Sequence, residues 1–198
     1  PMGTYITKKE FDSFYKYVPE RVLIILDEAY FEYANSSKDY PDSMSYRYDN
    51  VITLRSFSKA YGLGGVRIGY GFAHSELISN LIKVKVPFEP SSLAQVAATA
   101  ALDDYSFLSD TLELNRDGLA FLISNFKKLK VQYILSVTNF ITTIWGNKEE
   151  AEIITQKLLE NGIIVRHLES FGWPNYIRIS IGLKDENQKL INSLSKIL

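Results

Sequence analysis

One stretch of this sequence decides its interpretation: Leu54-Arg55-Ser56-Phe57-Ser58-Lys59-Ala60-Tyr61-Gly62-Leu63-Gly64-Gly65-Val66-Arg67. An apolar segment at residues 51–54 leads into it and predicts a buried strand. The serine hydroxyls and Arg67 are suited to binding a phosphate, and the glycines allow the backbone to approach that phosphate closely. Lys59 is an amine that can form a Schiff base with an aldehyde held beside the phosphate.

Pyridoxal phosphate carries an aldehyde and a phosphate on one molecule, and the stretch around Lys59 suits both groups. The same residues also fit an ordinary junction between a strand and a turn, in which Lys59 is exposed and has no chemical role. This segment alone leaves both interpretations open, and other parts of the chain are needed to choose between them.

A carboxylate and a phenol follow a second apolar run. Residues 22–26 are all apolar, which predicts a strand buried on both faces, and Asp27 and Tyr30 come directly after it. Ligands of open α/β sheets bind beyond the carboxyl ends of the strands, so we expect Asp27 and the lysine loop to line one crevice. Asp27 would then pair with a pyridinium nitrogen. The alternative is that Asp27 caps a helix or forms a turn.

Two arginines occur in apolar strand patterns near the end of the chain. Arg166 ends the run at residues 163–166, and Arg178 lies inside the run at residues 177–181. A guanidinium binds a carboxylate or a phosphate through parallel hydrogen bonds, so one or both arginines are predicted to bind a substrate anion. The alternative is an edge strand on which alternation places Tyr176, Arg178 and Ser180 together on a solvent-facing side.

The order of the patterns predicts an α/β protein with a mixed, mostly parallel sheet, followed by a small α+β unit. We expect the large domain to occupy residues 1–108 and the small domain residues 109–198. A capping box at Thr7 and Glu10 predicts a first helix that ends at Pro19. The other predicted helices span residues 74–85, 92–102, 104–129, 148–159 and 184–198. The other predicted strands span residues 66–72, 131–137, 140–145, 163–166 and 176–181.

Composition narrows the class of partner. The chain has 198 residues with 22 Lys and Arg against 23 Asp and Glu, so there is no basic excess for nucleic acid or an anionic membrane. It has no cysteine and only two histidines, and we therefore expect neither a disulfide nor a metal site. The apolar runs are far shorter than the roughly 20 residues of a membrane helix. These features fit a cytoplasmic protein, and we expect neither nucleic acid nor a membrane as its partner.

The motifs together resemble those of the fold-type I pyridoxal-phosphate aminotransferases, and most of all the histidinol-phosphate aminotransferase branch. The resemblance covers essentially the whole chain and implies the second half of a large cofactor-binding domain followed by a small C-terminal domain. The segments that carry it are Asp27-Glu28-Ala29-Tyr30, Ser56-Phe57-Ser58-Lys59, Arg67 and Arg178-Ile179-Ser180-Ile181-Gly182.

The resemblance implies a role for each candidate residue. Lys59 would be the Schiff-base lysine of pyridoxal 5'-phosphate, Asp27 would pair with the pyridine nitrogen, and Tyr30 would contact the phenolic oxygen. Arg178, assisted by Arg166, would bind the substrate anion. The residues expected to hold the cofactor phosphate are Ser56, Ser58 and Arg67.

The implied reaction moves an amino group between histidinol phosphate and 2-oxoglutarate, giving imidazole-acetol phosphate and glutamate, in a homodimeric enzyme of histidine biosynthesis. An aromatic aminotransferase or a decarboxylase of a phosphorylated amino acid remains an alternative. A further alternative is a catalytically incompetent fragment. This last interpretation arises because the chain begins at Pro1-Met2-Gly3, where the family pattern has an asparagine before the proline and a large upstream region.

Overall fold

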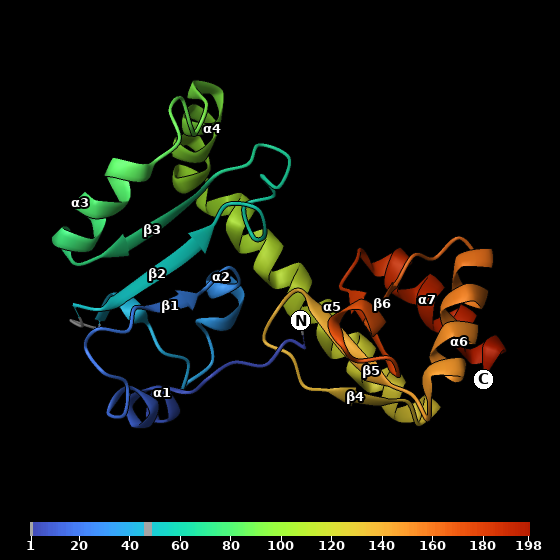
Figure 1. The fold of residues 1–198 in the computed structure, drawn as a ribbon. Coiled ribbons are helices and arrows are strands. Elements are labelled where there is room, and N and C mark those ends of the chain that lie inside the picture. The colour runs from blue at the N-terminus through green and yellow to red at the C-terminus, as the bar shows by residue number, and fades with distance from the viewer. Residues whose placement is uncertain (1, 46–48) are drawn as a thin grey trace. The chain divides into compact units, whose positions relative to one another are not determined.

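The computed structural model describes residues 2–45 and 49–198, and the chain divides into two compact units (Figure 1). The lysine unit is Tyr5–Asp110, which carries Lys59. The arginine unit comprises Pro1–Thr4 and Thr111–Leu198, and it carries Arg166 and Arg178. The division into a large and a small domain at residues 108 and 109 stays a prediction.

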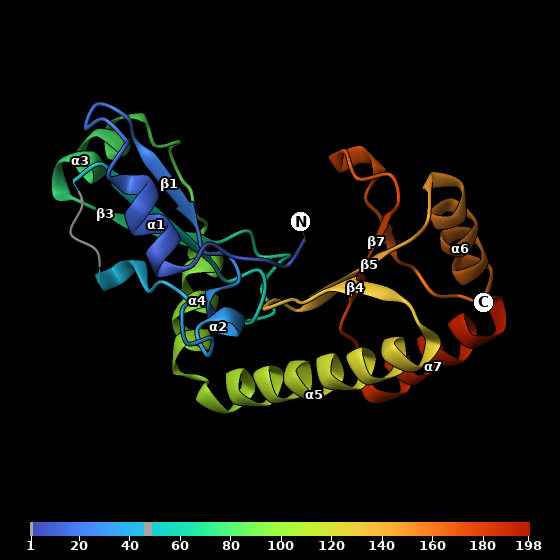
Figure 2. The same ribbon diagram turned by 90° about the horizontal axis from the view of Figure 1, so that it is seen from below.

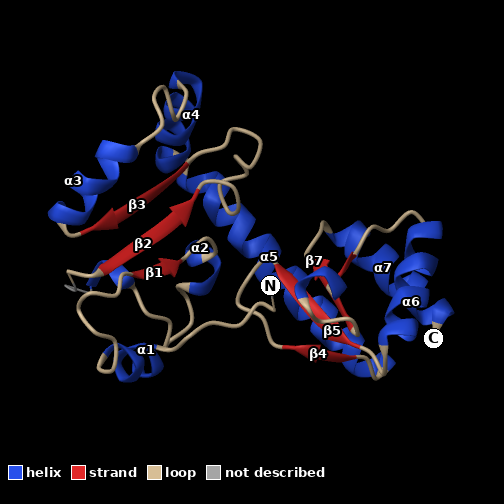
Figure 3. Ribbon diagram, in the orientation of Figure 1, coloured by secondary structure: helices blue, strands red, loops and turns tan. Residues whose placement is uncertain are grey.

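The lysine unit contains a three-stranded sheet in the order β1-β2-β3, seen in red in Figure 3. The central strand β2 pairs in parallel with β1 and antiparallel with β3, so the sheet is mixed, as predicted. Within the parallel pair, Asp27 lies opposite Leu54. The carboxyl ends of β1 and β2 therefore meet at one edge. The strand bounds are Ile24–Asp27 for β1, Val51–Ser56 for β2 and Gly69–Ala73 for β3.

Helix α1 (Lys8–Tyr15) covers one face of this sheet. It begins at the predicted capping box, in which Thr7 Oγ1 accepts from the Glu10 amide and the Glu10 carboxylate accepts from the Thr7 amide. Phe11 of α1 forms a buried cluster with Ile24 and Val51. Figures 1 and 2 both show α1 beside β1. The short helices α2 (Phe31–Ala34) and η1 (Ser43–Ser45) follow β1.

The second face of β1 is open in the described chain, and the prediction of a strand buried on both faces is wrong here. Ile25 of β1 is 60% exposed, and Leu54 of β2 on the same face is 39% exposed. Ile24, whose side chain lies on the face covered by α1, is only 9% exposed. An unbroken apolar run therefore indicates a strand, but the number of covered faces depends on which other elements pack against it.

Two further helices, α3 (Ser75–Val84) and α4 (Ser92–Asp103), follow β3. His74 caps α3 by accepting from the Glu76 amide, and Ser91 caps α4 by accepting from the Ala94 amide. Both helices begin close to the predicted residues. β3 begins at Gly69 and not at residue 66, because Arg67 has a positive φ of 61°, which interrupts extended backbone.

The arginine unit contains a four-stranded sheet in the order β4-β5-β7-β6, in which every neighbouring pair is antiparallel. Three helices contribute buried side chains to its core, and Figure 2 shows α5 and α7 beneath β4 and β5. The strands are β4 (Gln132–Ile134), β5 (Phe140–Ile144), β6 (Arg166–His167) and β7 (Tyr176–Ser180). The helices are α5 (Tyr105–Leu129), α6 (Lys148–Glu160) and α7 (Lys184–Ile197), and the 3-10 helix η2 spans Glu169–Phe171.

Helix α5 begins in the lysine unit and continues into the arginine unit. Its interior glycine, Gly118, is buried, and a methyl group added there would lie 2.4 Å from Ile181 Cγ2. Close packing between α5 and the segment after β7 thus explains a glycine inside a helix. Among residues 2–45 and 49–198, no helix combines the length and apolar character that a bilayer crossing requires.

Candidate active site

Asp27 lies at the carboxyl end of β1, and its carboxylate is exposed. Its Oδ1 accepts a hydrogen bond from the Ala29 amide at 3.0 Å, which stabilises the turn after the strand. The next amide, that of Glu28, donates to the Leu54 carbonyl oxygen at 2.8 Å. This bond extends the β1–β2 pairing by one residue, so the segment containing Asp27 starts beside the end of β2.

Lys59 lies in the turn that follows β2 and is half-buried. Its Nζ is 5.2 Å from the centroid of the Tyr30 ring, a distance at which an ammonium is attracted to an aromatic face. In the part of the chain that the structure describes, Lys59 forms no ion pair with a carboxylate. Among the residues described, the amine thus lies near the Tyr30 ring with no carboxylate bound to it.

The predicted phosphate residues surround a glycine-rich turn. Ser56 Oγ accepts from the Ser58 amide at 3.0 Å, and Arg67 Nη1 donates to the Gly64 carbonyl oxygen at 2.7 Å. A methyl group at Gly64 would approach the Ser58 carbonyl oxygen to 3.3 Å, so the two sides of the turn are close. The positive φ of Arg67, rare for a residue other than glycine, is the kind of backbone strain that occurs at ligand sites.

Arg67 also lines a cavity of about 500 Å³. Lys85 and Glu89 line the same cavity, so it has charged residues of both signs, and Ser91, the N-cap of α4, lines it as well. The lining residues are Val66, Arg67, Ile68, Gly69, Lys85, Phe88, Glu89, Pro90 and Ser91.

Burial also changes the acidity of side chains in the lysine unit. It raises the pKa of the Tyr61 phenol, and the negative charge of Glu32 raises it further. The pKa of Glu32 is itself raised by burial, while the charge of Arg55 acts in the opposite direction. Oε2 of Glu32 is buried and has no hydrogen-bond partner among residues 2–45 and 49–198, which disfavours its charged form.

Two charged residues in this region were not predicted from sequence. Glu28 and Arg55 form an ion pair at 2.9 Å between the segments after β1 and at the end of β2. The sequence pattern could have predicted this ion pair, because Arg55 interrupts an apolar strand just as Arg178 does. A buried arginine in such a run needs an anionic partner, and Glu28 is the buried partner of Arg55.

The arginine unit brings Arg166 and Arg178 together as cross-strand neighbours on β6 and β7. Because β7 lies inside the sheet, the alternative that Arg178 belongs to an edge strand is wrong. The expected alternation holds, since Ile177 and Ile179 are buried while Arg178 is half-buried. Its guanidinium carbon lies 4.8 Å from the centroid of the Phe140 ring. The guanidinium carbon of Arg166 lies 5.7 Å from the centroid of the Phe171 ring, and a guanidinium of this kind can bind an anion.

One cluster in the arginine unit has the residue types of a metal site. Ligand atoms of Glu152, His167 and Glu169 lie within 4.8 Å of one another. Lys148 forms ion pairs with both glutamates, at 3.6 Å to Glu152, and His167 Nε2 contacts the Pro174 carbonyl oxygen. The lysine ammonium already supplies positive charge to the cluster, and we assign no metal to it.

Comparison with known proteins identifies the family. The model of the family described as aminotransferase class I and II matches residues 1–194. The chain belongs to the class I and II aminotransferase family. It is 42% identical to a histidinol-phosphate aminotransferase of Geobacillus sp. (strain WCH70) across 100% of this chain and 54% of that enzyme. It is 40% identical to histidinol-phosphate aminotransferase 2 of Carboxydothermus hydrogenoformans, across 100% of this chain and 55% of that enzyme.

A solved structure supports the same assignment. The chain is similar to histidinol-phosphate aminotransferase from Sinorhizobium meliloti in complex with pyridoxal-5'-phosphate, with a TM-score of 0.91 and 30% identity. The similarity covers 100% of this chain and 54% of that one, so this aminotransferase chain spans about half the length of its relatives. The predicted family and its α/β fold are thereby confirmed. The roles of individual residues stay predictions.

Proposed function

We propose that the protein carrying this sequence transfers an amino group between histidinol phosphate and 2-oxoglutarate, with pyridoxal 5'-phosphate as cofactor. The proposal rests on the identity to histidinol-phosphate aminotransferases and on one structural observation. That observation is the register of β1 against β2, which sets the Asp27–Tyr30 segment beside the loop of Lys59, whose Nζ is 5.2 Å from the Tyr30 ring.

The chemistry of the donor set fits pyridoxal phosphate. An amine at Lys59 suits the aldehyde, and an exposed carboxylate at Asp27 suits the ring nitrogen. Hydroxyl groups and a guanidinium suit a phosphate, and they come from one glycine-rich turn. All these residues belong to the lysine unit. The proposed phosphate ligands are Ser56, Ser58 and Arg67.

When bound, pyridoxal phosphate supplies an aldehyde for an amine and a ring that withdraws electrons. Lys59 provides the amine in the resting protein, and its Nζ then holds and moves a proton, a contribution of about 10²–10⁴-fold. Asp27 would keep a ring nitrogen protonated by placing negative charge next to it. Tyr30 would hold the ring through its hydroxyl group. Arg178, assisted by Arg166, binds an anionic group of the substrate.

The test is a lysine substitution in the protein carrying this sequence. Lys59→Ala should abolish borohydride-fixed cofactor mass at this position, and it should lower turnover by at least about 10²-fold. Lys83→Ala is the matched control, because Lys83 is an exposed lysine of α3 that hydrogen-bonds Asn80 at 2.8 Å. Normal turnover by a folded Lys59→Ala variant would refute the role of the lysine.

Rates on three substrates separate the proposal from the alternatives. Transfer from histidinol phosphate should exceed transfer from phenylalanine and decarboxylation of threonine phosphate. A folded protein that fixes no cofactor and converts none of these compounds supports the incompetent-fragment interpretation instead. The homodimer, the cytoplasmic location and the domain division at residues 108 and 109 are part of the same proposal, and gel filtration of the protein measures the first of them.

A further inference from the structure

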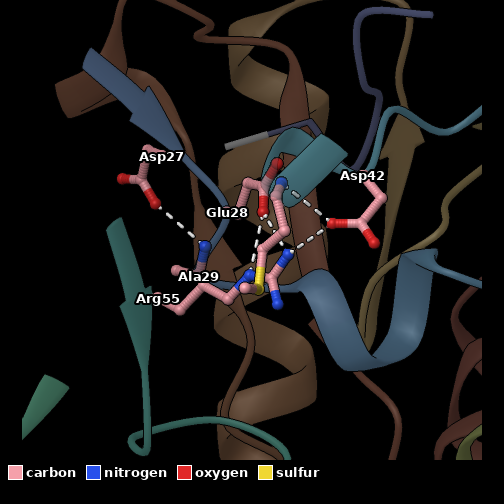
Figure 4. A network of polar contacts seen from close by, with 6 residues as sticks. Asp27, Glu28, Ala29, Asp42 and Arg55 are labelled. Carbon is pink, nitrogen blue, oxygen red and sulfur yellow. Dashed lines mark hydrogen bonds and ion pairs between the residues drawn. The ribbon is translucent and has the colours of Figure 1, made fainter. Parts of the chain in front are cut away.

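A buried ion pair joins the two segments that carry the proposed cofactor residues. Oε2 of Glu28 accepts a hydrogen bond from Nε of Arg55 at 2.9 Å and lies 2.9 Å from its Nη2. Both side chains are only 6% exposed. Figure 4 shows the pair between the segment after β1 and strand β2.

Arg55 is held by more than one group. Its Nη2 also lies 3.1 Å from Oδ1 of the half-exposed Asp42. Its guanidinium carbon is 3.3 Å from the centroid of the Phe31 ring. Phe31 directly follows Tyr30, so Arg55 contacts Glu28, inside the Asp27–Tyr30 segment, and the residue that comes after the segment. One side chain of β2 thus contacts the segment that follows β1 at two points.

The ion pair lies on the opposite side of the strands from the proposed cofactor residues. Asp27 and Leu54 are exposed, whereas their next neighbours, Glu28 and Arg55, are buried. Side chains alternate between the faces of a strand, which explains the separation. Ser56 lies on the same face as Leu54. Glu28 and Arg55 therefore do not share the face of Asp27, and their effect on a ligand there is indirect.

The positive charge of Arg55 is retained despite its burial. Burial acts to lower the pKa of Arg55, but hydrogen bonds and charge from Glu28 and Tyr70 outweigh it, so the pKa lies above its ordinary value. Buried ion pairs add little stability compared with apolar side chains of similar volume, whereas their hydrogen bonds define a geometry. The pair is thus better suited to fixing the distance between the segment after β1 and strand β2 than to stabilising the folded unit.

We propose that Glu28 and Arg55 form a clamp that positions the Asp27–Tyr30 segment against the loop of Lys59. The clamp rests on the proposed function, because it sets the separation between the carboxylate for the ring nitrogen and the amine for the aldehyde. Glu28 and Arg55 are positioning residues in this scheme. They act through the segments they join, and they are not catalytic themselves.

The first measurement needs no cofactor. The double variant Glu28→Leu with Arg55→Met replaces the pair by apolar side chains, which preserves packing and leaves no charge buried alone. Hydrogen exchange at the amides of Phe31 and Ser58 should become about tenfold faster or more, because these amides lie in the two joined segments and their own residues are unchanged. Exchange at strand β5 of the arginine unit should not change.

The second measurement uses pyridoxal phosphate. The dissociation constant of the double variant should rise about tenfold or more, as expected when binding groups are misplaced. The pH midpoint of the visible absorption of the bound cofactor should also move, because the distance between carboxylate and amine changes. The matched control is Glu113→Leu with Arg116→Met, the same chemical change at an exposed pair of α5, where the charges are 3.2 Å apart. This control should behave like the parent protein.

The outcomes separate the clamp from the proposed function. Unchanged hydrogen exchange in a folded double variant overturns the clamp, whatever the cofactor does. Faster exchange with an unchanged dissociation constant and an unchanged pH midpoint overturns its role in positioning cofactor groups. If the parent protein fixes no pyridoxal phosphate on Lys59, the proposed function fails, and faster exchange in the double variant still establishes the coupling of the two segments. Should the double variant not fold, Arg55→Lys supplies the same readouts, because a lysine keeps the charge but lacks the guanidinium fork.

Discussion

The lysine unit and the arginine unit bury their apolar side chains to very different degrees. The arginine unit has an extensive core built from its sheet and from helices α5, α6 and α7. The buried cluster of the lysine unit comprises Phe11, Ile24 and Val51. Large apolar residues of its helices and connecting segments are exposed, among them Val84, Phe88 and Leu93.

This difference indicates two ways of holding residues in place. In the arginine unit, Arg178 is positioned by a strand whose alternate residues, Ile177 and Ile179, are locked into a core. In the lysine unit, polar contacts at the ends of β1 and β2 take a larger share, above all the pair of Glu28 and Arg55. Substitution of apolar residues should therefore affect the arginine unit most, and substitution of buried charges should affect the lysine unit most.

The largest change in the free energy of unfolding is expected when a buried aromatic ring of the arginine unit is removed. Phe126→Ala should lower the free energy of unfolding by about 4 kcal/mol, because it removes a large buried side chain and leaves a cavity. Phe126 is 0% exposed, whereas Phe88 of the lysine unit is 97% exposed, so Phe88→Ala is the matched control and should have almost no effect. Urea unfolding followed by circular dichroism, which reports on the helices of both units, measures the change. Equal effects of the two substitutions would contradict the comparison.

The next effect is at the buried charge of the lysine unit. Arg55→Met should destabilise the unit by about 3 kcal/mol, because Glu28 is then buried without its cation. Arg116→Met is the control, since Arg116 is 70% exposed in an ion pair of α5, and its loss should not be measurable. Urea unfolding followed by circular dichroism gives both values. If adding Glu28→Leu to Arg55→Met restores stability, the unpaired carboxylate of Glu28 is the cause of the destabilisation.

A smaller change in stability is expected when each of two glycines, one from each unit, is replaced by alanine. Gly118→Ala should destabilise by about 2 kcal/mol, because the added methyl group overpacks a filled site. That methyl group would lie 2.4 Å from Ile181 Cγ2 and 2.9 Å from Asn187 Nδ2. Gly65 of the lysine unit has nothing within 4 Å of the same position, so Gly65→Ala should be neutral or stabilise by up to about 1 kcal/mol. Thermal unfolding of the two variants checks the opposite signs.

The smallest effects depend on pH and have opposite signs in the two units. Burial raises the pKa of Glu32 above 4.5, so its unfavourable effect on stability appears as the pH rises through the raised value. Glu32→Gln should therefore stabilise at neutral pH but not below pH 4.5. A hydrogen bond from Lys148 lowers the pKa of Glu169, so Glu169→Gln should destabilise above pH 4.5 and lose its effect at lower pH. Urea midpoints measured across this range test both signs.

Local signals in the sequence predicted the elements well. The capping box at Thr7 occurs where expected, because a cap depends on residues within one helical turn. The pairing of Asp27 with the end of β2 was also expected, since parallel strands align their carboxyl ends. Boundaries were less accurate where backbone conformation changes abruptly, as at Arg67 before β3.

Contacts between distant segments could not be predicted in the same way. The partner of Arg55 is 27 residues away, and no local rule selects Glu28 over the neighbouring Asp27. The position of β7 inside its sheet depends on β5 and β6 lying on either side of it. Burial of β1 was overestimated because the composition of a strand does not reveal how many of its faces are covered.

The amino-acid sequence by itself determined the order of helices and strands, the types of side chain beside Lys59 and the family to which the chain belongs. These properties depend on residue identity and on short-range backbone preferences. Only the tertiary structure decided which face of β1 is covered, that Arg166 lies opposite Arg178, and that Glu28 is bound by Arg55. Each of these depends on strand register and on packing between residues far apart in the chain, and the free energy of such contacts exists only once the chain has folded.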